Sequence, residues 1–242
     1  LRLLPAGSQR LLAVGGTGSL TGRTSSIESV VVGPVDSAVP KIVSWTIPNP
    51  GTPAKQKLEI LDGMRLYTFG GRGSGDKSST HAPLLTEAFV FDVAKQTVDK
   101  LPNLPTAQAG GIGFTNRKNS ESSVHVLVGG ERVVDASTTQ DHELLEFDPQ
   151  SQQWARISPT FASQVVDGTA TAFEQAIWIF PGSRKDNASS KVGHSPVLHW
   201  WGDESPITAI PAVAMPRTRS SFGGGRIGNE YFIIGGHSAS GE

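Results

Sequence analysis

The sequence predicts an all-β repeat protein, a β-propeller or a similar repeat array, from three observations. First, an apolar run ending on two glycines recurs at Leu11–Gly16, Leu66–Gly71, Val126–Gly130 and Phe232–Gly236. A degraded copy, Ile177–Gly182, precedes the last one, and successive copies are separated by 55, 59, 52 and 54 residues. A period near 50 residues is typical of propellers. Second, the 28 glycines and 16 prolines favour many short strands and turns. Third, no stretch of ten residues has the apolar periodicity of a helix.

Each cycle is expected to hold short strands separated by turns. Asp62-Gly63 is a two-residue hairpin signal, because both residues tolerate positive φ. Arg72–Ala82 and Glu131–Asp141 are expected to be polar loops. The strands expected in chain order are Leu11–Val14, Ile27–Val32, Lys41–Ile47, Lys57–Leu61, Met64–Phe69, Glu87–Phe91, Thr97–Leu101, Gly110–Phe114, Val124–Val128, Glu143–Phe147, Gln153–Ile157, Gly168–Phe173, Ala176–Phe180, Val197–Trp201, Ile207–Ile210, Arg219–Arg226 and Tyr231–Ile234.

The inner strands of the cycles are apolar on both sides. Val126–Val128, Ile177–Phe180 and Phe232–Ile234 lack the polar alternation of a half-exposed strand. A four-stranded sheet cannot bury both of its faces alone, whereas neighbouring sheets stacked face to face around an axis cover them. The strand pattern therefore predicts stacked four-stranded blades.

Two motifs carry a family resemblance. Met215–Gly225 holds a proline, arginines and small residues, and Tyr231–Gly236 is the apolar strand with its paired glycines. Phe147–Trp154 is an apolar strand with a turn and a following tryptophan, and Phe91–Val98 has valine in place of that tryptophan. These residues resemble the kelch repeat, and the likeness spans nearly the whole chain. The resemblance implies an all-β, kelch-type β-propeller of four-stranded blades with about five repeats visible, forming one domain over residues 1–242.

The chain departs from the kelch pattern in three places. Gln108 stands where the pattern has an arginine, Pro181-Gly182 replaces one glycine pair, and the last cycle lacks its two later strands. Kelch propellers usually have more blades than are visible here. The chain is therefore expected to be most of one propeller or a piece of a larger one, with other domains in a longer parent chain.

Composition excludes several classes of protein. The formal charge of -1 indicates no bulk attraction to nucleic acid. The chain has no cysteine, which excludes disulfides, thiolate catalysis and cysteine-ligated zinc. No apolar run approaches the length of a membrane span, so none is expected in this segment. The compartment is not determined, although the cytoplasm is slightly favoured.

The resemblance also implies where a ligand would bind. Ligands of such propellers usually contact the loops after the paired glycines and the segments that join one blade to the next. These loops carry charges of both signs, including Glu131, and ordinary solvated charges are the simplest interpretation of each. One arginine per blade could nevertheless form a ring that binds an acidic peptide or protein partner. The candidate contact residues are Arg72, Arg132, Arg184 and Arg219, with Gln108 and His81 as secondary candidates.

A protein-interaction scaffold is therefore favoured over an enzyme, and no catalytic residue, metal site or cofactor is predicted. Kelch-like copper oxidases need a cysteine, which is absent, and the six histidines lack the spacing of metal ligands on one element. His125 and His199 lie in expected strands and are interpreted as packing residues. Two alternatives stay open: a carbohydrate-active or sugar-isomerising propeller enzyme, and a structural subunit of a large assembly. Perturbed carboxylates in a deep channel would favour the enzyme, and an exposed apolar blade edge would favour the subunit.

Overall fold

The regular elements of the described chain are all β-strands, which confirms the all-β part of the predicted fold class. The computed structural model describes residues 2–5, 10–14, 17–18, 22–23, 26–31, 41–46, 54–55, 57–73, 82–117, 123–134, 137–140, 144–157, 166–173, 176–182, 196–201, 206–214, 219–220, 222–227 and 230–238. Within these ranges no helix is long and apolar enough to cross a membrane.

Four of the sheets are four-stranded and antiparallel, and each follows the chain in sequence order. The first contains β1 (Arg2–Pro5), β2 (Arg10–Val14), β5 (Ser26–Val31) and β6 (Lys41–Thr46). The second contains β8 (Leu58–Asp62), β9 (Arg65–Phe69), β11 (Ala88–Asp92) and β12 (Thr97–Leu101). The third contains β14 (Ile112–Arg117), β15 (Ser123–Val128), β18 (Leu144–Asp148) and β19 (Gln153–Ile157). The fourth contains β20 (Val166–Phe173), β21 (Ala176–Gly182), β22 (Pro196–Trp200) and β23 (Thr208–Ala214).

The fifth sheet has two described strands, β25 (Gly223–Ile227) and β26 (Glu230–Ile234). Short strands accompany the five sheets. They are β3 (Thr17–Gly18) with β4 (Gly22–Arg23), β7 (Ala54–Lys55) with β10 (Arg72–Gly73), β13 (Gln108–Ala109) with β16 (Glu131–Val134) and β17 (Ser137–Gln140), and β24 (Arg219–Ser220) with β27 (His237–Ser238).

Three expectations about local structure were wrong. Arg72 and Gly73, expected at the start of a polar loop, form β10 and pair with β7. The loop expected over Glu131–Asp141 holds the β16–β17 hairpin, in which Val133 pairs with Thr138 and Arg132 with Thr139. Val133, Thr138 and Thr139 are β-branched and favour strands, although polar neighbours surround them. The single strand expected over Arg219–Arg226 is divided into β24 and β25, which pair with different partners.

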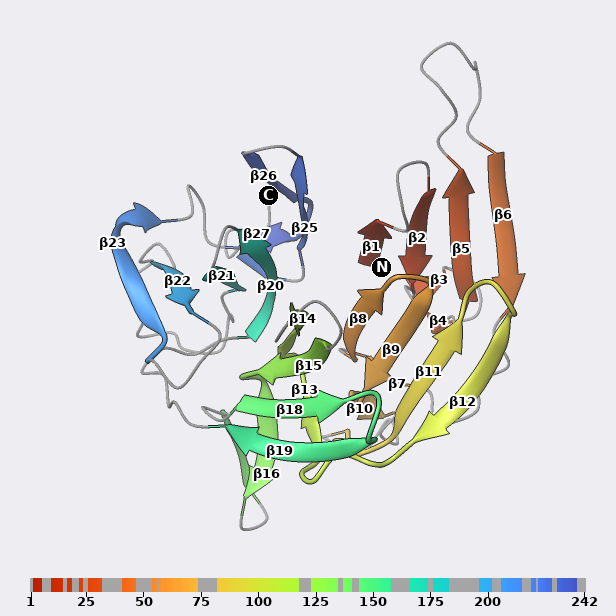
Figure 1. Cartoon of the computed structure of the whole chain (residues 1–242), viewed down its shortest axis with the longest axis horizontal. Coiled ribbons are helices and arrows are strands. Elements are labelled where there is room, and N and C mark those ends of the chain that lie inside the picture. The colour runs from red at the N-terminus through yellow and green to blue at the C-terminus, as the bar shows by residue number, and fades with distance from the viewer. Residues whose placement is uncertain are drawn as a thin grey trace.

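The sheets lie side by side with their first strands innermost. Figure 1 shows β1, β8, β14, β20 and β25 nearest the centre and β6, β12, β19 and β23 at the periphery. The first strands contact one another in the order β8, β14, β20, β25 and β1. This arrangement is consistent with blades, and a closed ring is not seen among the described residues.

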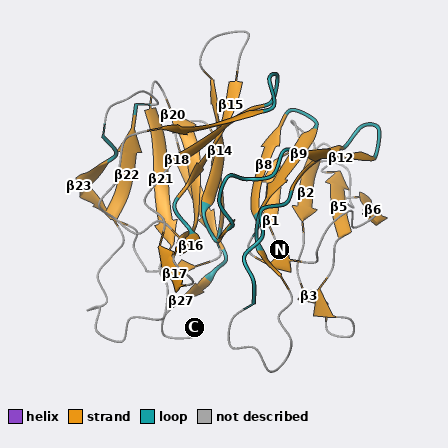
Figure 2. Ribbon diagram, turned by 90° about the horizontal axis from the view of Figure 1, so that it is seen from below, coloured by secondary structure: helices purple, strands orange, loops and turns teal. Residues whose placement is uncertain are grey.

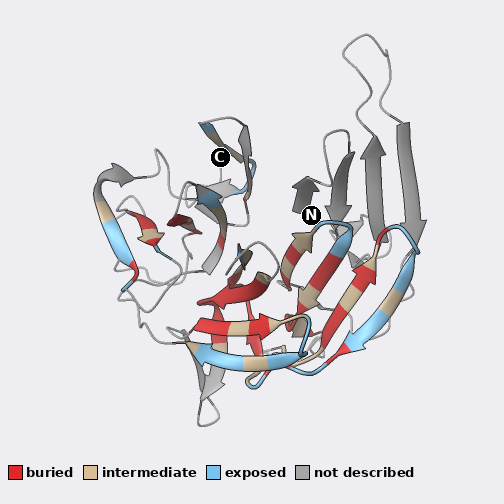
Figure 3. Cartoon of the chain, viewed as in Figure 1, coloured by how far each residue is buried: buried red, intermediate tan, exposed pale blue. Residues whose placement is uncertain are grey.

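Alternating side chains bury both faces of the inner sheets. Tyr67 and Phe69 of β9 point toward the third sheet, where they meet Leu127 in one apolar cluster. On the other face of β15, Val126 and Val128 join a second cluster with Ile177 of the fourth sheet. Figure 3 shows the buried positions concentrated on the inner strands and the exposed ones on β12 and β19. The apolar strand pattern therefore reflects burial between neighbouring sheets.

The paired glycines adopt one repeated backbone conformation. The first glycine has φ of 57° at Gly70, 65° at Gly129 and 74° at Gly235, and each following glycine also has positive φ. Residues with a Cβ rarely adopt this left-handed region. The strand in each of these cycles therefore turns in the same way into the segment that follows.

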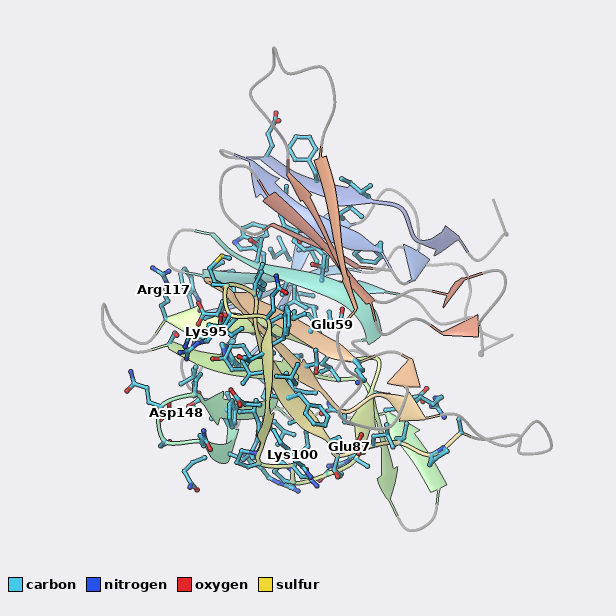
Figure 4. The ribbon with its side chains drawn as sticks, turned by 90° about the vertical axis from the view of Figure 1, so that its right-hand side faces the viewer. Glu59, Glu87, Lys95, Lys100, Arg117 and Asp148 are labelled. Atoms are coloured by element: carbon cyan, nitrogen blue, oxygen red, sulfur yellow. The ribbon has the colours of Figure 1, made fainter. Side chains whose placement is uncertain are left out.

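The opposite ends of the second and third sheets share a different turn. Asp92 accepts hydrogen bonds from the backbone N–H groups of Ala94 and Lys95, both at 3.0 Å, and Asp148 accepts one from Gln150 at 2.8 Å. Figure 4 shows Lys95, Arg117 and Asp148 together at this end of the two sheets, which we call the hairpin end. Aspartate at the first turn position stabilises such turns by accepting these bonds.

Candidate functional site

The candidate site lies at the end of the sheets where the paired glycines occur. Figure 2 shows β3, β16, β17 and β27 gathered at one end of the molecule, and β3, β16 and β27 each follow a glycine pair directly. Four polar residues of the short strands β10, β13 and β16, which accompany the second and third sheets, lie at this end. We call them the loop-face cluster: Arg72, Gln108, Glu131 and Arg132.

Arg72 and Glu131 occupy equivalent positions, each being the first residue after a glycine pair. Arg72 Nη2 forms an ion pair with Glu131 Oε2, and Arg72 Nη1 donates a hydrogen bond to the carbonyl of Ala82 at 3.1 Å. Their side chains are 18% and 8% exposed, so water screens the pair only weakly. The pair joins the loops of two neighbouring sheets.

Gln108 connects three backbone segments at the centre of the cluster. Its side chain is 1% exposed, and Nε2 donates a hydrogen bond to the carbonyl of Gly129. Its own carbonyl accepts the N–H of Gly71 at 2.8 Å, and its N–H donates to Leu85 at 3.2 Å. Among the described residues, Gln108 Oε1 has no hydrogen-bond partner. A buried acceptor of this kind calls for a donor from water or a ligand.

The strand pairing shows which positions of the third and fifth cycles correspond to each other. Gln108 lies opposite Arg132 in the β13–β16 pair, and Arg219 lies opposite Ser238 in the β24–β27 pair. The two pairs occupy equivalent places beside their glycine pairs. Gln108 and Arg219 are therefore equivalent backbone positions, and Arg132 is a half-buried neighbour of Gln108.

The structure places three of the six sequence-predicted site residues, Arg72, Gln108 and Arg132, on adjoining segments of the chain. Arg219 has a described backbone, and its side chain lies outside the described set. His81 and Arg184 lie outside the described residues altogether. Contact of all six with a ligand stays a prediction.

Sequence reasoning noted Glu131 in the loop without recognising its role. The signal was present, because Glu131 and Arg72 both directly follow a glycine pair and carry opposite charges. The equivalent positions of adjacent sheets lie close enough for their side chains to meet. Arg72 is thus partly neutralised inside the protein before any acidic ligand arrives. Within the described residues, no group of three side chains is placed to hold a metal ion.

Glu131→Gln is expected to lower the free energy of unfolding by about 2 kcal/mol, because it leaves the largely buried Arg72 without its counter-charge. Adding Arg72→Gln should recover part of that loss, and urea denaturation of the double-mutant cycle measures the coupling. Lys95→Ala is the control, because the Lys95 side chain is 73% exposed. The variant loses only the ion pair between Lys95 Nζ and Asp92 Oδ2, which are 3.6 Å apart. That control should change stability by less than about 0.5 kcal/mol. Equal losses in Glu131→Gln and Lys95→Ala would contradict a buried pair.

Comparisons of the sequence with models of protein families and with curated proteins find no match. The proposed function therefore rests on the all-β sheets, the repeated glycine geometry and the loop-face cluster.

Proposed function

We propose that the chain is a kelch-type β-propeller, or most of one, acting as a rigid protein-interaction module. Four four-stranded antiparallel sheets in sequence order support the blade assignment. Glycine pairs with matching positive φ at Gly70, Gly129 and Gly235 support the repeat. The kelch assignment itself rests on the motif resemblance, because a fold alone does not determine function.

The ligand proposed is an acidic peptide or an acidic loop of a protein partner. The observation that carries this proposal is the loop-face cluster, in which Arg72 pairs with Glu131 and the neighbouring Arg132 pairs with Gln108 in the β13–β16 register. Guanidinium groups bind carboxylates through two parallel hydrogen bonds. Loops fixed on a rigid scaffold commonly carry binding sites.

Each residue of the cluster has a proposed role. Arg132 contacts the ligand carboxylate, while Arg72 exchanges its partner Glu131 for a ligand carboxylate or stays paired and shapes the loop. Gln108 Oε1 accepts an N–H donor from the ligand or from a bridging water. The mechanism is binding alone, without a bond made or broken.

Arg132→Ala is expected to weaken binding to an aspartate- and glutamate-rich peptide by about tenfold, measured by fluorescence anisotropy on hits from an acidic peptide array. Arg219→Ala tests the fifth-sheet candidate in the same assay. The matched control is Arg117→Ala, an exposed arginine at the hairpin end (Figure 4). Equal weakening by Arg117→Ala would indicate unspecific charge attraction and contradict the proposed site.

A further inference from the structure

The short strand β13 (Gln108–Ala109) runs between two successive glycine pairs. A Cβ at Gly70 would overlap the carbonyl oxygen of Gln108, and a Cβ at Gly130 would lie 2.6 Å from the carbonyl oxygen of Ala109. Approaches this close require glycine, because any other residue would place a side chain in the same space. The backbone of β13 therefore contacts the glycine pairs of both the second and the third sheet.

Gln108 binds the two glycine pairs through different groups. Its backbone carbonyl accepts the N–H of Gly71 at 2.8 Å, and its backbone N–H donates to the carbonyl of Leu85 at 3.2 Å. Its side-chain Nε2 donates instead to the carbonyl of Gly129. The side chain is buried, so water does not compete for this bond. The backbone of Gln108 is thus attached to segments beside the second sheet, and its side chain to the end of the third.

The two glycine pairs lead directly into the ion pair of the loop-face cluster. Gly71 immediately precedes Arg72, and Gly129 lies two residues before Glu131. Glu131 also lies opposite Ala109 in the β13–β16 register. A residue that fixes the position of both glycine pairs therefore fixes where the side chains of Arg72 and Glu131 begin.

We propose that Gln108 is a positioning residue, whose side-chain bond to Gly129 holds the two glycine pairs at the separation where Arg72 reaches Glu131. A buried ion pair offsets the cost of removing its charges from water only when its geometry is good. Loss of the bond lets the third glycine pair shift relative to the second, and so weakens the ion pair although neither charge is altered. The bearing of Gln108 on ligand binding rests on the proposed function, whereas its effect on the ion pair needs no ligand.

Gln108→Met tests this role, because methionine keeps the length and volume of the side chain but cannot donate a hydrogen bond. The coupling between Arg72→Gln and Glu131→Gln is measured by double-mutant cycles in urea, with Gln108 and with Met at that position. The coupling is expected to fall by at least half in the Gln108→Met protein. Gln108→Asn, whose amide is one carbon shorter, should act in the same way and replaces Gln108→Met if that protein does not fold. Unchanged coupling in the folded variant overturns the proposal.

Phe147→Leu is the control for a general loss of packing between the second and third sheets. Phe147 is fully buried, and its ring centroid lies 5.8 Å from that of Phe69. The variant should lower stability by creating a cavity, yet it leaves the bond between Gln108 and Gly129 intact. The coupling between Arg72→Gln and Glu131→Gln should therefore stay as it is in the wild-type protein. An equal loss of coupling in Phe147→Leu and Gln108→Met would contradict a specific role of Gln108.

Native-state hydrogen exchange locates the change in the Gln108→Met protein. The amides of β16 (Glu131–Val134) are expected to exchange faster than in the wild type, because β16 directly follows the released glycine pair. The Gly71 amide should keep its protection, since the backbone carbonyl that accepts its N–H is not altered. Faster exchange throughout both sheets would indicate general loosening and contradict the proposal. None of these measurements uses a ligand, so their outcome is independent of whether an acidic peptide binds.

Discussion

Replacement of Gly70 by alanine is expected to lower the free energy of unfolding by about 4 kcal/mol, the largest effect of any substitution considered. Gly70 has φ of 57°, a conformation that costs an alanine about 1 kcal/mol. A Cβ at Gly70 would also overlap the carbonyl oxygen of Gln108 and lie 3.1 Å from that of Leu85. Displacing these backbone groups adds about 3 kcal/mol. Urea denaturation measures the total.

Gly63→Ala separates the two causes. Gly63 has φ of 59°, almost the same as Gly70, and a Cβ there would meet no atom within 4 Å. This control should lose only about 1 kcal/mol, the cost of the backbone conformation alone. If both alanine variants lose the same amount, close approach of the Gln108 segment does not contribute.

Acidification is expected to remove about 3 kcal/mol of stability through His125. The ring is fully buried. Its centroid lies 4.1 Å from that of the Tyr67 ring and 6.4 Å from that of the Phe147 ring. Burial lowers the pKa of His125 from 6.5 to about 4, and the Asp62 carboxylate opposes the shift. Among the described residues Nε2 has no hydrogen-bond partner, while Nδ1 lies 3.4 Å from the Thr115 hydroxyl. The buried ring is therefore neutral near pH 7.

The direction of the pH effect follows from the two pKa values. Between pH 6.5 and about pH 4 the unfolded chain binds a proton at this position that the folded protein does not. Stability is therefore complete above pH 6.5, declines as the pH falls through this window, and levels off below about pH 4. The decline amounts to about 3 kcal/mol, since each pKa unit corresponds to about 1.4 kcal/mol.

His125→Phe provides the comparison for this effect, because it keeps an aromatic ring of similar size without a titrating group. Urea denaturation at several pH values should show a shallower decline for the variant between pH 6.5 and 4. Carboxylates that titrate near pH 4 contribute to both proteins and cancel in the difference. Parallel curves for the two proteins would exclude His125 as the source.

The strands were largely predictable because their residues satisfy local and global requirements together. Thr97–Leu101 and Gln153–Ile157 have the expected bounds. The hairpin expected at Asp62-Gly63 is present but shifted by one residue, because Asp62 pairs with Arg65 and the two loop residues are Gly63 and Met64. Adjacent Trp200 and Trp201 lie on opposite faces of the chain, since Trp200 is 1% exposed and Trp201 is 54% exposed. Period-two alternation alone determines that difference.

The polar contacts of the candidate site were not predictable in the same way. The interpretation of Arg72 and Gln108 as loop residues contained nothing about the ion pair with Glu131 or the burial of Gln108. Both depend on packing between distant segments, since Arg72 and Glu131 are 59 residues apart and Gln108 and Gly129 are 21 residues apart. The β16–β17 hairpin was missed because its polar composition resembles that of a loop.

The Arg72–Glu131 pair also has a consequence for the order of the sheets. These residues occupy the same position in consecutive copies of the repeat, yet they carry opposite charges. Two copies of the second sheet placed side by side would bring two arginines together, and two copies of the third would bring together two glutamates. Of these three arrangements, only the mixed neighbours are neutral at this contact. The charge difference therefore disfavours two copies of the second sheet, or two of the third, as neighbours during assembly.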